Sequence, residues 1–122
     1  HAAIAAIKGD RSAVEEMRLS SLRRRELMVD GLAAIPGVIA PKPAGAFYMV
    51  AEFSAYRGKR AGNRHRAPVA ELADWLLEKH LVATVPGTAF GDSNCIRFSF
   101  AAADSDIKIG LERIATGLAE LE

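Results

Sequence analysis

The segment of residues 85–100 constrains the fold more than any other part of the chain. In its second half every other residue is large and apolar: Ile96, Phe98 and Phe100. Side chains of a β-strand alternate between the two faces of a sheet, so this spacing predicts a strand with one buried face. Arg97 then points to the opposite face. An earlier strand is expected to stop at Pro86-Gly87, and a loop containing Gly91 joins the two strands.

Arg97 has two interpretations at this point. Its guanidinium is permanently charged and carries a planar set of N–H donors that matches a carboxylate or a phosphate. It could form an ion pair with an acidic side chain of the same chain, because a buried arginine is seldom left unpaired. Alternatively, it could bind an anionic ligand. The spacing of the residues alone leaves both interpretations open.

The rest of the chain predicts a small two-layer α/β (α+β) domain. Its 122 residues suit one domain with a small core. The periodicity of apolar residues predicts helices over residues 12–34, 68–79 and from Asp104 or Ser105 to about 121. Asp104 or Ser105 is expected to cap the last helix, and its buried stripe is expected to be Ile107, Leu111, Ile114 and Leu118. Strands are expected over residues 45–53, 81–85 and around Ile96. In the first of these Tyr48 and Val50 point away from Met49, and the near-continuous apolar sequence predicts that both faces are covered. The last two strands should be antiparallel neighbours, so helices would cover a mainly antiparallel sheet of about three strands.

Three local details of this scheme can be checked. Ser12 and Glu15 have the spacing of a capping box at the start of the long helix. The apolar stripe of that helix is expected to include Val14 and Met17. Tyr48 is read either as a catalytic residue or as a core tyrosine whose hydroxyl reaches the rim. Residues 54–66 are rich in arginine and glycine and predict a surface loop.

Composition narrows the classes of function. The net charge of +1 gives no strong field toward nucleic acid or a membrane, and the run Arg23-Arg24-Arg25 is expected to be a salt-bridged face. No apolar run approaches the length that spans a bilayer. The single cysteine excludes an internal disulfide and a cysteine-based zinc site. We therefore expect a cytoplasmic domain with no metal and with neither nucleic acid nor membrane as a partner.

Several motifs occur in a specific order along the chain. Pro86-Gly87 is followed by Phe90-Gly91 and then by Arg97-Phe98-Ser99. Upstream motifs are Arg24-Arg25, Leu32, Ile35-Pro36-Gly37-Val38 and Gly45-Ala46-Phe47-Tyr48. In this order and spacing, over nearly all 122 residues, they resemble the C-terminal small domain of class I/II pyridoxal-phosphate-dependent aminotransferases, a fold-type I group. The sequences of residues 45–53 and 85–100 are most similar to those of the aspartate aminotransferases.

The resemblance implies a role for three residues. Arg97 would hold the α-carboxylate of the substrate, with Gly45 and Phe90 as further substrate-binding residues. The whole enzyme would be a homodimer that transfers an amino group between an aspartate-like amino acid and a 2-oxo acid. In this family the cofactor lysine belongs to a preceding large domain, and none of the five lysines here directly follows a serine, as in the S-K setting.

The same resemblance predicts that residues 1–122 are one small domain of a longer protein. Residues 1–9 would be the end of a preceding helix, and the upstream cofactor domain would be absent. The chain begins with His1 rather than Met, which agrees with that expectation. The piece itself is then expected to contain no catalytic or cofactor-binding residue, to bind no pyridoxal phosphate and to be inactive.

Two other functions stay open. Some bacterial transcription regulators carry an aminotransferase-like domain that senses an effector, and such a domain would share the arginine motif. The chain could also be a standalone structural domain. The residues upstream of His1 would discriminate between these possibilities, because such a regulator carries a winged-helix domain upstream.

Overall fold

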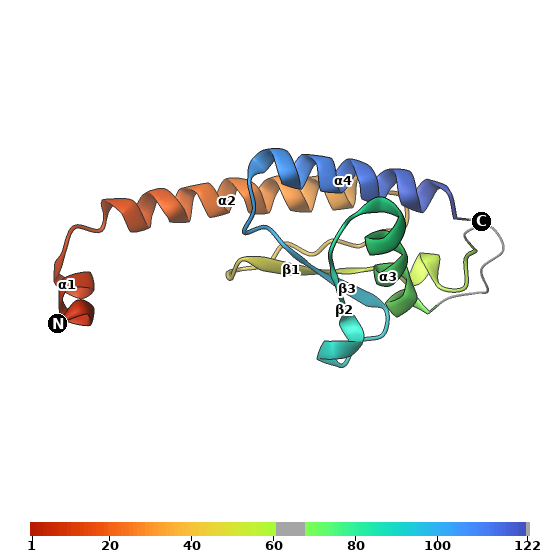
Figure 1. Cartoon of the computed structure of the whole chain (residues 1–122), viewed down its shortest axis with the longest axis horizontal. Coiled ribbons are helices and arrows are strands. Elements are labelled where there is room, and N and C mark those ends of the chain that lie inside the picture. Colours follow the sequence, from red (N-terminus) through yellow and green to blue (C-terminus); the bar gives the residue numbers. More distant parts are fainter. Residues whose placement is uncertain (61–67, 122) are drawn as a thin grey trace.

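The computed structural model describes residues 1–60 and 68–121. Figure 1 shows a sheet with helices packed on one side and a helical arm that extends away from it. The helices are α1 (Ala2–Lys8), α2 (Ser12–Ala33), α3 (Val69–His80) and α4 (Asp104–Ala119), and the strands are β1 (Tyr48–Glu52), β2 (Val85–Pro86) and β3 (Cys95–Ser99). Two short 3₁₀ helices, η1 (Ser54–Tyr56) and η2 (Gly87–Phe90), complete the described elements.

The sheet has the strand order β1-β3-β2, and both pairs are antiparallel. This confirms the predicted antiparallel pairing of the last two strands and makes β3 the central strand. The expected strand over residues 81–85 is shorter than predicted, because β2 contains only Val85 and Pro86. Leu81 adopts a left-handed backbone (φ 56°) that ends α3, and the amide of Val82 bonds back to the carbonyl of Leu76, so the chain leaves the helix before it can join the sheet.

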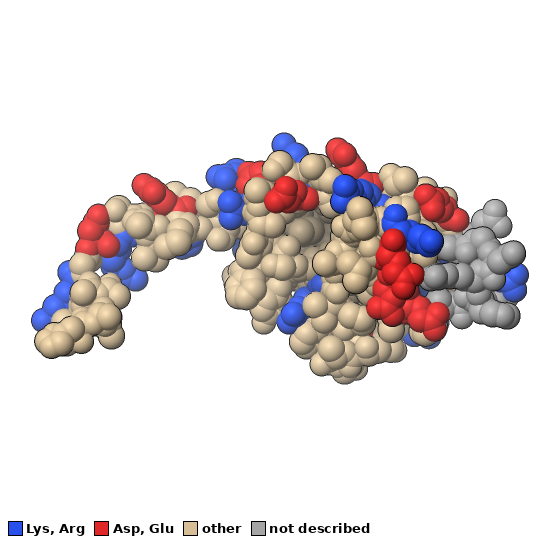
Figure 2. All heavy atoms as spheres, in the orientation of Figure 1, with Lys and Arg blue, Asp and Glu red and all other residues tan. Residues whose placement is uncertain are grey.

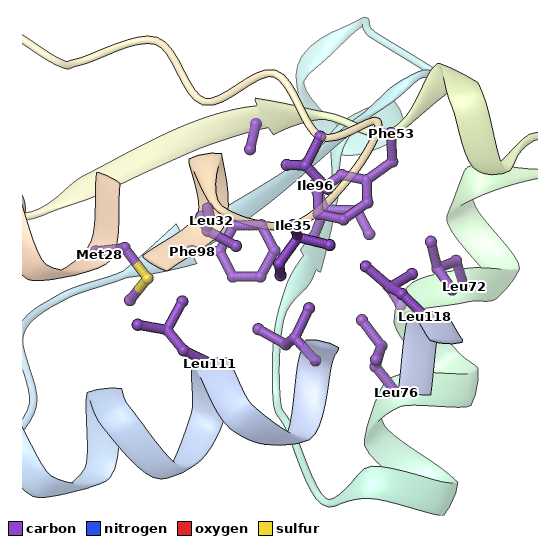
Figure 3. Packing of buried hydrophobic residues seen from close by; sticks show 14 of the residues in the cluster. Met28, Leu32, Ile35, Phe53, Leu72, Leu76, Ile96, Phe98, Leu111 and Leu118 are labelled. Carbon is purple, nitrogen blue, oxygen red and sulfur yellow. The ribbon is translucent and has the colours of Figure 1, made fainter. Parts of the chain in front are cut away.

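The core lies between the sheet and helices α2, α3 and α4 (Figure 3). Ile96, Phe98 and Phe100 are 0%, 4% and 2% exposed, which confirms the period-two prediction for this strand. The predicted apolar stripe of α4 is likewise buried: Ile107, Leu111, Ile114 and Leu118. Among the described residues no charged or polar side chain is buried, so the free energy of this core comes from apolar burial.

The first half of α2 differs from the prediction. Val14 and Met17 are 52% and 62% exposed, because that half of the helix extends past the sheet (Figure 1). Met28 and Leu32, further along α2, lie over the sheet and are buried. The prediction of a capping box at Ser12 and Glu15 is also wrong. The Ser12 hydroxyl and amide both bond to the carboxylate of Asp10, and Arg11 occupies the cap position.

The arginine run forms the salt-bridged face that the sequence predicted. Arg23 and Arg24 both donate to the carboxylate of Asp104, at 2.9 and 3.0 Å, and Arg25 pairs with Glu26 at 2.8 Å. Asp104 is therefore not the cap of α4. Ala103 holds that position, and the Asp104 carboxylate instead ties α4 to α2. On the face seen in Figure 2, basic and acidic side chains are interspersed along these two helices.

Of the predicted surface loop 54–66, residues 61–66 lie outside the described residues. Residues 54–60 are mostly exposed, and η1 forms one turn within them. No helix among the described residues is long and apolar enough to cross a membrane. Within residues 1–60 and 68–121, no cluster of three metal-ligating side chains occurs.

Candidate functional site: an arginine on the open face of the sheet

Arg97 lies on the sheet face opposite to the core. It occupies the middle of β3, where Val50 of β1 is its partner on one side and Val85 of β2 on the other. Its neighbours in sequence, Ile96 and Phe98, are buried in the core, so the backbone at Arg97 is fixed from both sides and from below. The side chain is half-buried. A rigid strand therefore presents the guanidinium on a face that none of the described α-helices covers.

Two aromatic rings contact the guanidinium. The Cζ atom of Arg97 is 4.4 Å from the ring centroid of Phe90 and 5.1 Å from that of Tyr48. Among the described residues no carboxylate forms an ion pair with Arg97, so the described part of the chain offers no support for the ion-pair interpretation. In the part of the chain that the structure describes, no hydrogen bond uses the N–H donors of Arg97, so these donors are available to an external carboxylate or phosphate.

The loop of residues 87–95 places Phe90. Gly87 is buried at the start of this loop, and its carbonyl accepts the amide of Asp92 at 3.1 Å. Gly91 has φ +86°, a left-handed conformation that favours glycine and ends η2 directly after Phe90. The Asp92 carboxylate accepts the amide of Asn94 at 2.8 Å and the thiol of Cys95 at 3.1 Å. These bonds close the loop, and Phe90 projects from it with 54% of its surface exposed.

These contacts shift the pKa values of two titratable groups in the loop, Asp92 and Cys95. The backbone amide of Asn94 stabilises the carboxylate of Asp92 and lowers its pKa, and the Cys95 thiol lowers it further. Burial, followed by the neighbouring Asp92, raises the pKa of Cys95 to about 11. At neutral pH the thiol is therefore protonated and acts as a donor within the loop rather than as a nucleophile.

Gly45, the third predicted site residue, lies in an exposed bend before β1. A Cβ atom at this position would meet no atom within 4 Å beyond the adjacent residues. The structure thus brings Arg97 and Phe90 together, whereas nothing packs against the open side of Gly45. Its role in substrate binding stays a prediction.

Tyr48 also lies at this site, although the resemblance assigned no substrate-binding role to it. The interpretation of Tyr48 as a core tyrosine is wrong, because this residue is 39% exposed and lies on the same face as Arg97. Val50 on that face is also 38% exposed, although the apolar sequence of β1 suggested two covered faces. Period-two alternation already placed Tyr48 opposite to Met49. The register that pairs Tyr48 with Ser99, two residues from Arg97, came only from the structure.

The fold and the arginine site define a class of protein when compared with known proteins. The family described as aminotransferase class I and II matches residues 1–114. The chain belongs to this family, which confirms the resemblance seen in the sequence. An aspartate aminotransferase of Streptomyces avermitilis is 43% identical over 118 residues, which cover 97% of this chain and 29% of that protein. A probable aspartate/prephenate aminotransferase of Aquifex aeolicus is 40% identical over 123 residues, covering 99% of this chain and 30% of that protein.

Solved structures agree with the sequence comparisons. The aspartate aminotransferase of Rhizobium meliloti superposes with a TM-score of 0.94 at 36% identity, over 99% of this chain and 30% of that one. An aspartate aminotransferase of Thermus thermophilus solved with maleate gives 0.73 at 36% identity, over 88% of this chain and 25% of that one. The fold is that of the C-terminal domain of aminotransferase structures. The chain spans less than a third of the length of these relatives.

The family depends on pyridoxal phosphate, and the described residues do not fit that cofactor. It is bound through a lysine that needs a sheltered site, because the amine must lose its proton. All five lysines are exposed: Lys8, Lys42, Lys59, Lys79 and Lys108. Lys42 forms an ion pair with Glu26 at 2.6 Å, and the ammonium of Lys59 lies over the ring of Tyr56 at 5.3 Å.

Proposed function

We propose that this chain is the substrate-carboxylate-binding small domain of a pyridoxal-phosphate-dependent aminotransferase. Arg97 binds the α-carboxylate of an amino acid and, in the second half of the reaction, that of a 2-oxo acid. The observation that carries this proposal is a guanidinium on the central strand whose N–H donors meet no carboxylate of the described chain. A bidentate, charge-assisted pair with a carboxylate supplies both affinity and orientation.

An aspartate-like amino acid is the proposed donor. The names of the relatives support this choice, because those from Streptomyces and Rhizobium are aspartate aminotransferases and the Thermus enzyme was solved with maleate, a dicarboxylate. Arg97 accounts for one carboxylate of such a substrate. Phe90 lines the same site, and Gly45 is placed there on the strength of its motif alone.

The cofactor and its lysine are proposed to lie in a large domain that precedes residues 1–122 in the longer protein. The mismatch between pyridoxal phosphate and the exposed lysines of this chain supports that assignment. We place the whole enzyme in the cytoplasm, and the resemblance implies that it is a homodimer. A single buried cysteine is compatible with a reducing compartment.

The test is the intact aminotransferase carrying Arg97→Ala, assayed with aspartate and a 2-oxo acid. We expect kcat/KM to fall on the order of a hundredfold or more, because binding and orientation are lost together. Arg97→Lys should recover little of this loss, since an ammonium has no planar pair of donors. The melting temperature should change little, because no described carboxylate loses a partner.

Arg113→Ala is the matched control. Arg113 lies on α4, on the far side of the core, where it donates to the carbonyl of Leu81 at 3.4 Å, and its loss should leave turnover unchanged. Near-normal turnover of Arg97→Ala together with a large fall in melting temperature would refute the proposal. It would show that Arg97 is a structural residue.

A further inference from the structure

The two rings at Arg97 reach it from opposite sides of the central strand. Tyr48 belongs to β1, which pairs with one edge of β3. Phe90 belongs to η2, which continues directly from β2 on the other edge of β3. The Arg97 Cζ atom lies 5.1 Å from the first ring centroid and 4.4 Å from the second. Three separate elements, of which β1 is distant in the sequence, therefore meet at this guanidinium.

Aromatic rings hold an arginine differently from a carboxylate. A cation within about 6 Å of a ring centroid is attracted by the negative face of the ring. This attraction restrains the guanidinium without using any of its N–H donors. A carboxylate partner would occupy those same donors and would compete with a ligand. In the described chain the rings are present and the carboxylate is not.

The exposure of the two rings also indicates that they restrain Arg97 rather than fill the core. Phe90 is 54% exposed and Tyr48 is 39% exposed, so neither contributes to the core as a buried aromatic would. Tyr48 is in turn supported by Phe47, whose ring packs edge-on against it with centroids 5.4 Å apart. The loop that carries Phe90 is closed by the hydrogen bonds of Gly87 and Asp92. Both rings are thus held in place on their own elements.

We propose that Tyr48 and Phe90 form an aromatic clamp that positions the guanidinium of Arg97 and keeps its N–H donors free for the substrate carboxylate. The inference rests on the proposed function of Arg97 and adds two positioning residues to it. Because the rings flank the guanidinium, a planar carboxylate reaches it along the donor edge, which is the bidentate geometry. The clamp acts through Arg97, and its effect is on carboxylate binding.

The test compares variants that lose a ring with variants that keep one, in the intact aminotransferase. Tyr48→Leu and Phe90→Leu remove a ring and keep an apolar side chain, whereas Tyr48→Phe and Phe90→Tyr retain it. We expect each leucine variant to raise the KM for aspartate about two- to thirtyfold, the range of one cation–π contact, with a smaller change in kcat. The ring-keeping variants should restore most of the lost affinity.

A double-mutant cycle separates the clamp from a general structural role. In the Arg97→Ala background the rings have no cation to hold, so Tyr48→Leu and Phe90→Leu should cause little further rise in KM. Thermal unfolding is measured for every variant. If Tyr48→Leu fails to fold, Phe90→Leu decides the matter, because Phe90 lies on an exposed loop and not in the sheet.

The outcomes distinguish the clamp from the proposed function. If Arg97→Ala lowers kcat/KM as expected while both leucine variants keep a normal KM, the clamp is wrong and the carboxylate-binding role stands. Equal KM values for ring-losing and ring-keeping variants also overturn the clamp, as does an undiminished effect of ring loss in the Arg97→Ala background. If Arg97→Ala itself has no effect, the proposed function fails, and the clamp fails with it.

Discussion

Gly87→Ala is expected to destabilise the loop that carries Phe90. A Cβ atom built at Gly87 lies 2.3 Å from the carbonyl oxygen of Asp92, and 2.5 and 2.9 Å from the carbonyl oxygen and carbon of Cys95. All three are backbone atoms, so they cannot rotate away as the end of a side chain would. The chain must move instead, and the carbonyl of Gly87 accepts the Asp92 amide at this point. Glycine is required here by close approach of the backbone.

The loss of unfolding free energy in Gly87→Ala is the difference between two opposing contributions. Forcing extra atoms into a packed site costs about 1–3 kcal/mol, and three backbone contacts below van der Waals distance favour the upper end. Replacing glycine by alanine stabilises by about 0.4–1 kcal/mol through the lower entropy of the unfolded chain. The net loss should be about 2 kcal/mol, a large fraction of the roughly 5–15 kcal/mol that stabilises a domain.

The assay is chemical denaturation of the wild-type protein, Gly87→Ala and a matched control, Gly110→Ala. Gly110 lies within α4, and an added Cβ there meets no atom within 4 Å. The control should therefore be more stable than wild type by up to about 1 kcal/mol, from helix propensity alone. Equal or higher stability of Gly87→Ala would refute the close approach on which the geometry of the Phe90 loop depends.

Three further predictions concern titration, thiol reactivity and the cofactor. Arg23 and Arg24 lower the pKa of Asp104 from 3.8 to about 2, so its contribution to stability is complete above pH 3.8 and is lost as the pH falls through about 2. The unfolding free energy of wild type should therefore fall more steeply over that window than that of Asp104→Asn, and parallel curves would contradict this. With its pKa raised to about 11, Cys95 should react with iodoacetamide at pH 8 far more slowly in the folded than in the unfolded protein, and equal rates would show an accessible thiolate. Residues 1–122 alone should form no stoichiometric adduct with pyridoxal phosphate that borohydride fixes on a single lysine, because every lysine is exposed, and such an adduct would place a cofactor site within this chain.

Much of the fold could be predicted from the local spacing of apolar residues. The alternation of Ile96, Phe98 and Phe100 placed Arg97 on the open face, and the stripe of α4 was correct along its length. These predictions succeed because side-chain direction in a strand or helix is set by backbone geometry, which repeats every 2.0 or 3.6 residues whatever the surroundings. The ordered motifs, from Arg24 to Ser99, also resemble the family whose model matches residues 1–114.

The features that the sequence could not predict depend on which segments of the chain contact each other. Val14 and Met17 are as apolar as Met28 and Leu32, yet only the second pair is buried, because only that half of α2 lies over the sheet. Tyr48 entered the site through strand register, and Phe90 through the folding of a loop onto β3. Periodicity within one segment determines which way a residue points. The partner it meets is determined by register and by the close approach of distant segments, and both exist only in the folded chain.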